Sequence, residues 1–112
     1  MKDLQTSAKF YQNALNLKVI DQKEYPDAMM IYLTDGEFIL ELRQFKESFD
    51  FEVDRRVNHI AFYTDDFEND LKRHQAMKIV DRVLLDFGLY FIIDPDGHSI
   101  EIIRNSECGI RN

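Results

Sequence analysis

The sequence predicts an α+β fold in which one structural unit occurs twice. Residues 35–43 (DGEFILELR) and 96–104 (DGHSIEIIR) each read as a turn followed by a strand with a glutamate near its centre. An amphipathic helix pattern and further apolar strands precede each of these stretches. Matching segments that recur along one chain are typical of an internal duplication.

The first copy is predicted to begin with a helix and to continue with three strands. Apolar residues recur at helical spacing from Leu4 to Leu15. Asp3 is the expected N-cap, and Asn16 stands where the helix should end, because Asn tolerates the left-handed conformation. The expected strands lie at 17–24, 28–33 and 37–44, with a hairpin turn at 34–36.

The second copy has the same order and one additional strand in front of its helix. Its expected elements are a strand at 57–64, a helix at 65–77, and strands at 79–86, 88–93 and 98–104. The turn 94–97 (DPDG) precedes the last strand. The first copy lacks a counterpart of strand 57–64, because its helix already begins near residue 3.

Strand alternation predicts which side chains share a face. In the last strands, Phe38, Leu40 and Leu42, and likewise Ile100 and Ile102, should pack toward the helices. Ile60 and Phe62 should do so in strand 57–64. The residues expected on the opposite face include Glu41, His59, Glu101, Arg43 and Tyr63.

Glu41, His59 and Glu101 therefore form a candidate metal site. Each residue taken singly is more often a solvent-side glutamate or a hydrogen-bonded structural histidine. Three residues of metal-ligand types at matching strand positions favour a shared site instead. His74 and His98 are predicted to be an ordinary helix-face residue and a turn residue. Surface or structural roles are also favoured for Arg43 and Tyr63 over contact with a substrate.

Composition narrows the class of protein. The 112 residues suffice for one domain, with 45% hydrophobic and 31% charged residues. A net charge of -7 argues against nucleic acid and anionic membrane surfaces as partners. There is no apolar run long enough for a membrane span and no apparent signal peptide. Cys108 is the single cysteine, so no intramolecular disulfide can form, and this fits a reducing cytoplasm. Its expected role is that of a spare surface thiol.

These stretches resemble the vicinal oxygen chelate (VOC) superfamily, and within it glyoxalase I, or lactoylglutathione lyase. The resemblance rests on 2–15, on Ile39-Leu40-Glu41-Leu42, on 58–62 (NHIAF), and on 91–97 (FIIDPDG) followed by Ile100-Glu101-Ile102. It implies two βαβββ modules that form a cupped, barrel-like sheet, with the first strand of module one absent. It also implies one VOC domain over 1–112, with modules at about 1–45 and 57–112 and a linker at about 46–56.

The resemblance also implies a function. Glu41, His59 and Glu101 match three ligands of one divalent metal ion, which would be zinc, nickel or cobalt. The implied reaction moves a proton between adjacent carbons of a hemithioacetal of a 2-oxoaldehyde such as methylglyoxal, through an enediolate. Glu101 would be the catalytic base, with Glu41 its partner across the metal. A homodimer in contact through module one is expected, because an exposed sheet edge invites pairing.

The family's fourth ligand would fall before residue 1, which leaves three interpretations of the N-terminus. The sequence would result from a start assigned too late, from a deliberate truncation or from a natural loss of the strand. Such a form could lack the metal. Alternative functions are a binding protein that sequesters an antibiotic without chemistry, another VOC metalloenzyme such as an epimerase or thiol transferase, or an inactive chain. The thiol stays open, since Lys46, Arg55 and Arg56 read as a solvated charge run.

Overall fold

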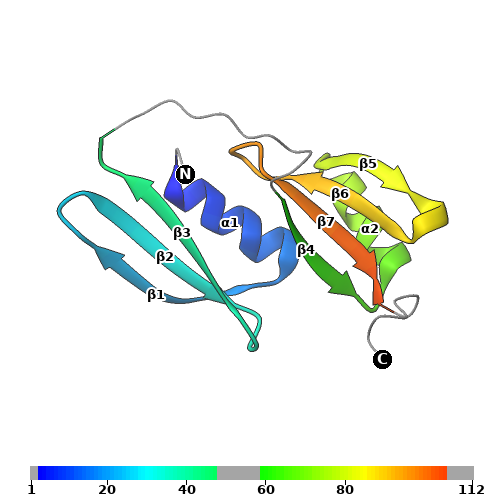
Figure 1. Cartoon of the computed structure of the whole chain (residues 1–112), viewed down its shortest axis with the longest axis horizontal. Helices are drawn as coiled ribbons and strands as arrows, with labels where there is room; N and C mark the ends of the chain where they lie inside the picture. Colours follow the sequence, from blue (N-terminus) through cyan, green and yellow to red (C-terminus); the bar gives the residue numbers. More distant parts are fainter. Residues whose placement is uncertain (1–2, 48–58, 106–112) are drawn as a thin grey trace. The chain divides into compact units, whose positions relative to one another are not determined.

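The computed structural model describes residues 3–47 and 59–105, with His59 described by its backbone alone. The chain divides into two compact units, Met1–Glu52 and Val53–Asn112, and each has its own sheet and helix (Figure 1). The α+β fold class is confirmed. The assignment of both modules to one domain stays a prediction, and most of the proposed linker 46–56 lies outside the described residues.

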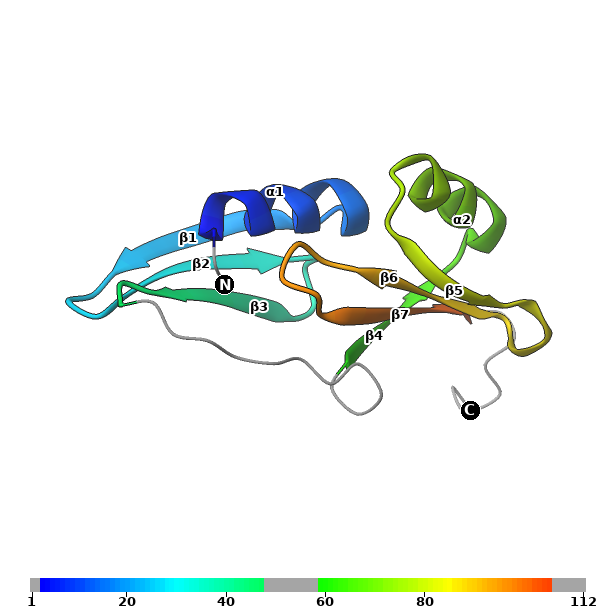
Figure 2. The same cartoon turned by 90° about the horizontal axis from the view of Figure 1, so that it is seen from above.

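The first unit places one helix on a three-stranded antiparallel sheet. Its elements are α1 (Leu4–Leu15), β1 (Lys18–Glu24), β2 (Ala28–Thr34) and β3 (Ile39–Phe45), with sheet order β1-β2-β3. Figure 2 shows α1 along one face of this sheet. All four elements agree with the expected segments to within two residues at either end.

Both predicted caps of α1 are confirmed. The Asp3 carboxylate accepts a hydrogen bond from the Thr6 backbone N–H at 3.3 Å, which satisfies one of the first-turn donors. Leu4 donates its N–H to Gln44 Oε1 on β3 at 2.8 Å, and this bond ties the helix start to the sheet. Asn16 ends the helix in the left-handed region, with φ 58°.

The core of the first unit lies between α1 and the sheet. Ile31 pairs with Leu42 across β2 and β3, and the two side chains are only 2% exposed. The alternation predicted for β3 is confirmed, since Leu42 is buried while Glu41 and Arg43 are exposed and Ile39 is 64% exposed. The face that carries Glu41 is therefore the face without the helix.

The second unit repeats this arrangement and adds an edge strand. Its elements are β4 (His59–Thr64), α2 (Phe67–Ala76), β5 (Val80–Leu84), a 3-10 turn η1 (Leu85–Phe87), β6 (Leu89–Ile93) and β7 (Ser99–Arg104). The sheet order is β4-β7-β6-β5, with β4 parallel to β7 and the other pairs antiparallel.

Shared irregularities support the predicted duplication. The first strand after each helix carries a bulge, between Val19 and Asp21 in β1 and between Val80 and Arg82 in β5. Each helix is followed by a residue in the left-handed region, Asn16 or Lys78, the latter with φ 61°. No described residue of the first unit forms a counterpart of β4.

Two details of the second unit differ from expectation. Ile60 was predicted to pack, but it is 41% exposed, and Phe62 is half-buried. The reason is that β4 is an edge strand, whereas α2 packs toward β5 at the opposite edge of the sheet. The expected strand 79–86 ends at Leu84, because η1 follows and closes at Gly88 in the left-handed region, with φ 65°.

Candidate functional site

Glu101 occupies the centre of β7, on the face of the second sheet that turns away from α2. Its register partners are Ala61 on β4 and Phe91 on β6. The neighbouring Ile100 and Ile102 point the other way, and they are 0% and 2% exposed. Glu101 itself is half-buried, so its carboxylate stands among small and apolar neighbours while still accessible to a ligand.

The backbone of His59 lies beside the same part of β7. His59 pairs with Ser99, and Glu101 follows Ser99 by two residues on this parallel neighbour. Standard strand spacing then puts the Cα atoms of His59 and Glu101 roughly 8 Å apart. Side chains of this length can reach one metal ion across such a distance, since metal bonds to imidazole and carboxylate are about 2 Å long. The His59 side chain lies outside the described part of the structure.

Glu41 lies in the first unit and already has a charged partner there. Its Oε2 accepts hydrogen bonds from Arg43 Nη2 at 2.8 Å and from Arg43 Nε at 3.2 Å. On β2, Tyr32 is its register partner. Burial raises the pKa of Tyr32, and the neighbouring charge of Glu41 adds to this effect. Arg43 thus holds the Glu41 carboxylate, which is one specific structural role for this arginine.

The candidate ligands belong to two different units of the chain. Glu101 and the backbone of His59 lie together in the second unit, and Glu41 lies in the first. Among the described side chains, no group of three or more His, Cys, Asp and Glu residues is arranged to hold a metal ion. Since this set lacks the His59 side chain, the three-ligand site stays a prediction.

Phe91 on β6 lies next to Glu101 in the register of the second sheet, and Arg82 lies one strand further away, on β5. Arg82 on β5 pairs with Phe91, and its guanidinium carbon lies 4.8 Å from the centre of that ring. Phe91 is 9% exposed. Glu101 therefore has an aromatic ring as its neighbour on β6, and the cation of Arg82 lies over that ring.

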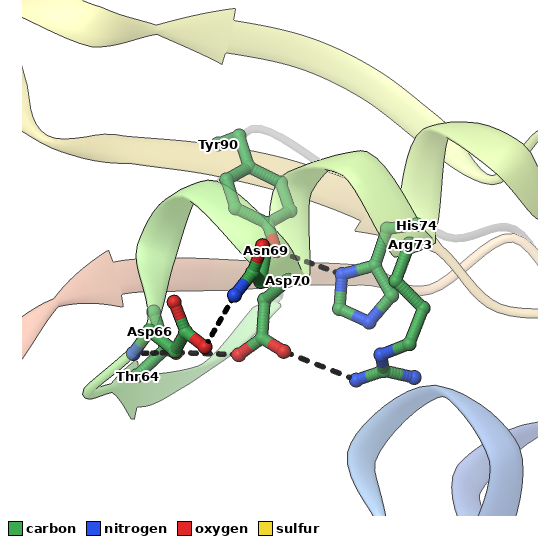
Figure 3. A network of polar contacts seen from close by, with 7 residues as sticks. All are labelled: Thr64, Asp66, Asn69, Asp70, Arg73, His74 and Tyr90. Carbon is green, nitrogen blue, oxygen red and sulfur yellow. Dashed lines mark hydrogen bonds and ion pairs between the residues drawn. The ribbon is translucent and has the colours of Figure 1, made fainter.

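Sequence reasoning missed a buried polar network on the opposite face, under α2 (Figure 3). His74 is 1% exposed, and its Nδ1 lies 2.7 Å from the hydroxyl oxygen of Tyr90, which is itself fully buried. Burial raises the pKa of Tyr90, and the nearby Asp70 charge adds to this. In the sequence, the burial of His74 is indicated by its helical spacing from Phe67, which is also buried.

The rest of this network secures the start of α2. The Thr64 hydroxyl donates to Asp70 Oδ2 and accepts from the Asp66 N–H, the latter at 3.0 Å. Arg73 forms an ion pair with Asp70 at 3.4 Å. Because these groups lie on the helix side of the sheet, we assign them to stability rather than to the site around Glu101.

His98 lies in the turn before β7, as predicted. Asp94 is 4% exposed, and its Oδ1 accepts hydrogen bonds from the backbone N–H groups of Asp96 at 2.9 Å and His98 at 2.8 Å. This closed turn fixes the start of β7 and thereby the position of Glu101.

The repeated helix-and-sheet unit, with a glutamate on each last strand, defines a duplicated α+β protein with a candidate site on strand faces. The model of the Glyoxalase/Bleomycin resistance protein/Dioxygenase superfamily matches residues 1–102, and the chain belongs to this superfamily. The family resemblance expected from the sequence is confirmed, and the VOC fold with it.

The chain is similar to known proteins both in sequence and in structure. Lactoylglutathione lyases of Neisseria meningitidis serogroups A and B are each 28% identical over 114 residues, covering 91% of this chain and 83% of theirs. A trypanothione-dependent glyoxalase I of Leishmania major has a TM-score of 0.84 at 25% identity, covering 95% of this chain and 81% of that one.

A further structural relative shows the fold alone. The fosfomycin resistance protein FosX of Listeria monocytogenes, in a complex with Mn(II), has a TM-score of 0.77 at 20% identity, covering 92% of this chain and 84% of its own. No helix within the described ranges has the length and apolar character needed to cross a membrane.

Proposed function

We propose that this chain is a metal-dependent lyase of the glyoxalase I type. Its substrate would be the hemithioacetal that a 2-oxoaldehyde such as methylglyoxal forms with a small thiol. The observation that carries the proposal is the similarity to lactoylglutathione lyases along 91% of the chain. The position of Glu101 beside the backbone of His59 supports it, because it brings two suitable ligand types onto adjacent strands.

The chemistry of the donor set suits one divalent metal ion. Glu41 and Glu101 supply carboxylate oxygens, and His59 supplies an imidazole nitrogen, a mixture that fits zinc, nickel or cobalt. The bound cation would stabilise the negative charge that develops on two adjacent substrate oxygens. The ion pair with Arg43 orients the Glu41 carboxylate.

Glu101 is the proposed base. Its carboxylate would take the proton from the carbon bonded to sulfur and return it to the adjacent carbon. The ring of Phe91, its register partner on β6, lies beside it. Glu41 is its proposed partner on the other side of the reacting centre. We further propose that the protein acts in the cytoplasm as a homodimer.

Metal content and activity test this function together. Elemental analysis of the 112-residue protein, after incubation with nickel or zinc, should give close to one ion per chain. Glu101→Gln should lose the ion, and it should lower kcat/KM for the methylglyoxal–glutathione hemithioacetal at least about 100-fold. Glu37→Gln, which removes an equal charge at an exposed turn, should change neither.

Two results would count against the proposal. Full activity in Glu101→Gln would show that Glu101 is not the base. Tight binding of an aromatic antibiotic by metal-free protein, with no isomerase activity in the loaded form, would indicate the sequestering function instead.

A further inference from the structure

The sheet of the first unit extends past the helix that covers it. Figure 2 shows the hairpin between β1 and β2 reaching beyond the first turn of α1. A cavity of about 410 Å³ opens at this end of the unit, lined by the start of α1 and by residues of all three strands. Sites for small molecules have volumes of roughly 300–1,000 Å³, so this cavity is large enough for a compact ligand.

The cavity lies on the helix side of the sheet, opposite the face that carries Glu41. Glu24, Met29 and Gln44 line it, and they are partners in one row across β1, β2 and β3. Gln44 faces the helix, because its Oε1 accepts the hydrogen bond from the Leu4 N–H at 2.8 Å. Register partners share a face of the sheet, so the whole row faces α1. The cavity is therefore separate from the candidate metal site.

The floor of the cavity is apolar. Leu4 and Ile31 line it and are 4% and 2% exposed, so both are fixed by packing in the core. Met29 is half-buried, and its thioether is a favourable contact for an aromatic ring. A flat ring would cover these side chains and bury apolar surface of its own.

Three carboxamides surround this floor. Gln5 and Gln22 are exposed, and Gln44 is half-buried. Within the described ranges, no group bonds to the side-chain amides of Gln5 and Gln22 or to the amide nitrogen of Gln44. A carboxamide holds donors and an acceptor side by side, and it therefore pairs with a group that has the same arrangement, such as another amide.

The charges of the lining select against an anion. Asp3 and Glu24 place carboxylates at the cavity, and Lys46 neutralises only Glu24, in an ion pair of 2.6 Å. Lys23 also belongs to the lining, but its ammonium lies on the opposite face, 5.4 Å from the centre of the Tyr32 ring. The described lining thus offers an anionic ligand no cation, whereas a neutral ligand needs none.

We propose that this cavity is a second binding site, which takes a neutral aromatic amide. The ring lies on Met29 and Leu4, and the amide bonds to Gln22 and Gln44. Because the occupant bonds to Gln44, it also contacts the residue that ties α1 to β3. The site goes beyond the proposed lyase function, since it uses neither the metal nor the face of Glu41.

Benzamide is the simplest probe of this chemistry, and benzoate is its anionic counterpart of equal size. Proton–nitrogen correlation NMR of the protein in EDTA should show benzamide shifting the backbone signals of residues at the cavity, Leu4 and Met29 among them, with a dissociation constant of about 1 mM. Benzoate should bind at least about tenfold more weakly, because it has no N–H donor and carries the same charge as Asp3 and Glu24.

A substitution at the rim tests the role of the carboxamides. Gln22→Leu removes one carboxamide at nearly constant size and should weaken benzamide binding at least about fivefold. Gln12→Leu makes the same change at an exposed position of α1 outside the cavity, and it should leave the affinity unchanged. The spectrum of each variant also reports whether it is folded.

Three results would overturn the site: no shifts at the cavity with about 10 mM benzamide, equal affinity for benzoate, or an affinity of Gln22→Leu no lower than that of Gln12→Leu. The metal content and lyase activity of the parent chain do not enter these measurements, so either proposal can fail without the other.

Discussion

At the scale of single residues, His74 and Tyr90 form a buried polar contact in the second unit. Both side chains are essentially fully buried, and the His74 Nδ1 lies 2.7 Å from the Tyr90 hydroxyl oxygen. Burial favours the un-ionised phenol, which forms a hydrogen bond with Nδ1 of the imidazole. Removal of one partner therefore leaves the other with an unmet hydrogen bond in a dry place.

Tyr90→Phe should lower the free energy of unfolding by about 1–3 kcal/mol. The ring and its packing against Phe67 remain, so the loss reports the hydrogen bond. Urea unfolding followed by circular dichroism would measure it. Tyr25→Phe removes a hydroxyl from a ring that is 43% exposed and should change little, so equal losses in both variants would contradict this account.

The raised pKa of Tyr90 predicts an alkaline limit to stability. A group that binds its proton more tightly in the folded state stabilises the fold below its ordinary pKa of 10.0, and this contribution is lost as pH rises above that value. Between pH 10 and 11, the parent should lose up to about 1.4 kcal/mol per pH unit relative to Tyr90→Phe. Parallel slopes for the two proteins would exclude the effect.

At the scale of elements, the two helices end in the same conformation with different residues. Asn16 follows α1 with φ 58°, and Lys78 follows α2 with φ 61°. Asn adopts this region at low cost because its short polar side chain can hydrogen-bond to the nearby backbone, whereas Lys has no such group. The second helix end therefore holds strain that the first avoids.

Lys78→Gly should raise the free energy of unfolding by about 0.5–1 kcal/mol, because glycine adopts positive φ without the steric cost. Lys72→Gly is the matched control, since it removes the same side chain from an exposed position inside α2. It should lower the free energy of unfolding by about 1 kcal/mol. Thermal unfolding would measure both, and a loss in both variants would show that the Lys78 side chain matters more than its backbone.

Local patterns in the sequence predicted most element boundaries. Helical spacing found α1 with both caps, and alternation found the buried and exposed faces of β3. Ile60 was assigned to the core incorrectly because alternation gives the face of a strand but not its distance from the helix. His74 was treated as an ordinary helix-face residue because its hydrogen bond depends on Tyr90, which only tertiary packing brings near.

At the scale of the whole molecule, a metal ion would connect the two units chemically. For the candidate site, the sequence predicted the strand faces that carry Glu41 and Glu101, because alternation along each strand and the internal duplication indicate them. The distance between these carboxylates depends on how one unit packs against the other, and no local pattern in the sequence sets that packing. The sequence therefore predicts which residues are the candidate ligands of one metal site, but not the distances between them.

Saturating nickel or zinc should stabilise the protein, because an ion that binds only the folded state shifts the unfolding equilibrium. At about 100 times the dissociation constant, the gain is roughly 2.7 kcal/mol, visible as a higher Tm. Glu101→Gln should abolish this gain, whereas Glu37→Gln should retain it. An unchanged Tm of the parent protein with either ion would contradict the proposed centre.

The paired bulges have a consequence for how the length of the chain can change. Ile20 in β1 and Asp81 in β5 have no partner in the register of their ladders. Deletion of either residue would leave every other residue of the strand on its present face and would only straighten the strand. Most single-residue deletions in a strand would instead exchange its two faces. Ile20 and Asp81 are thus the places where natural variants or engineered forms could shorten a strand without turning its core side outward.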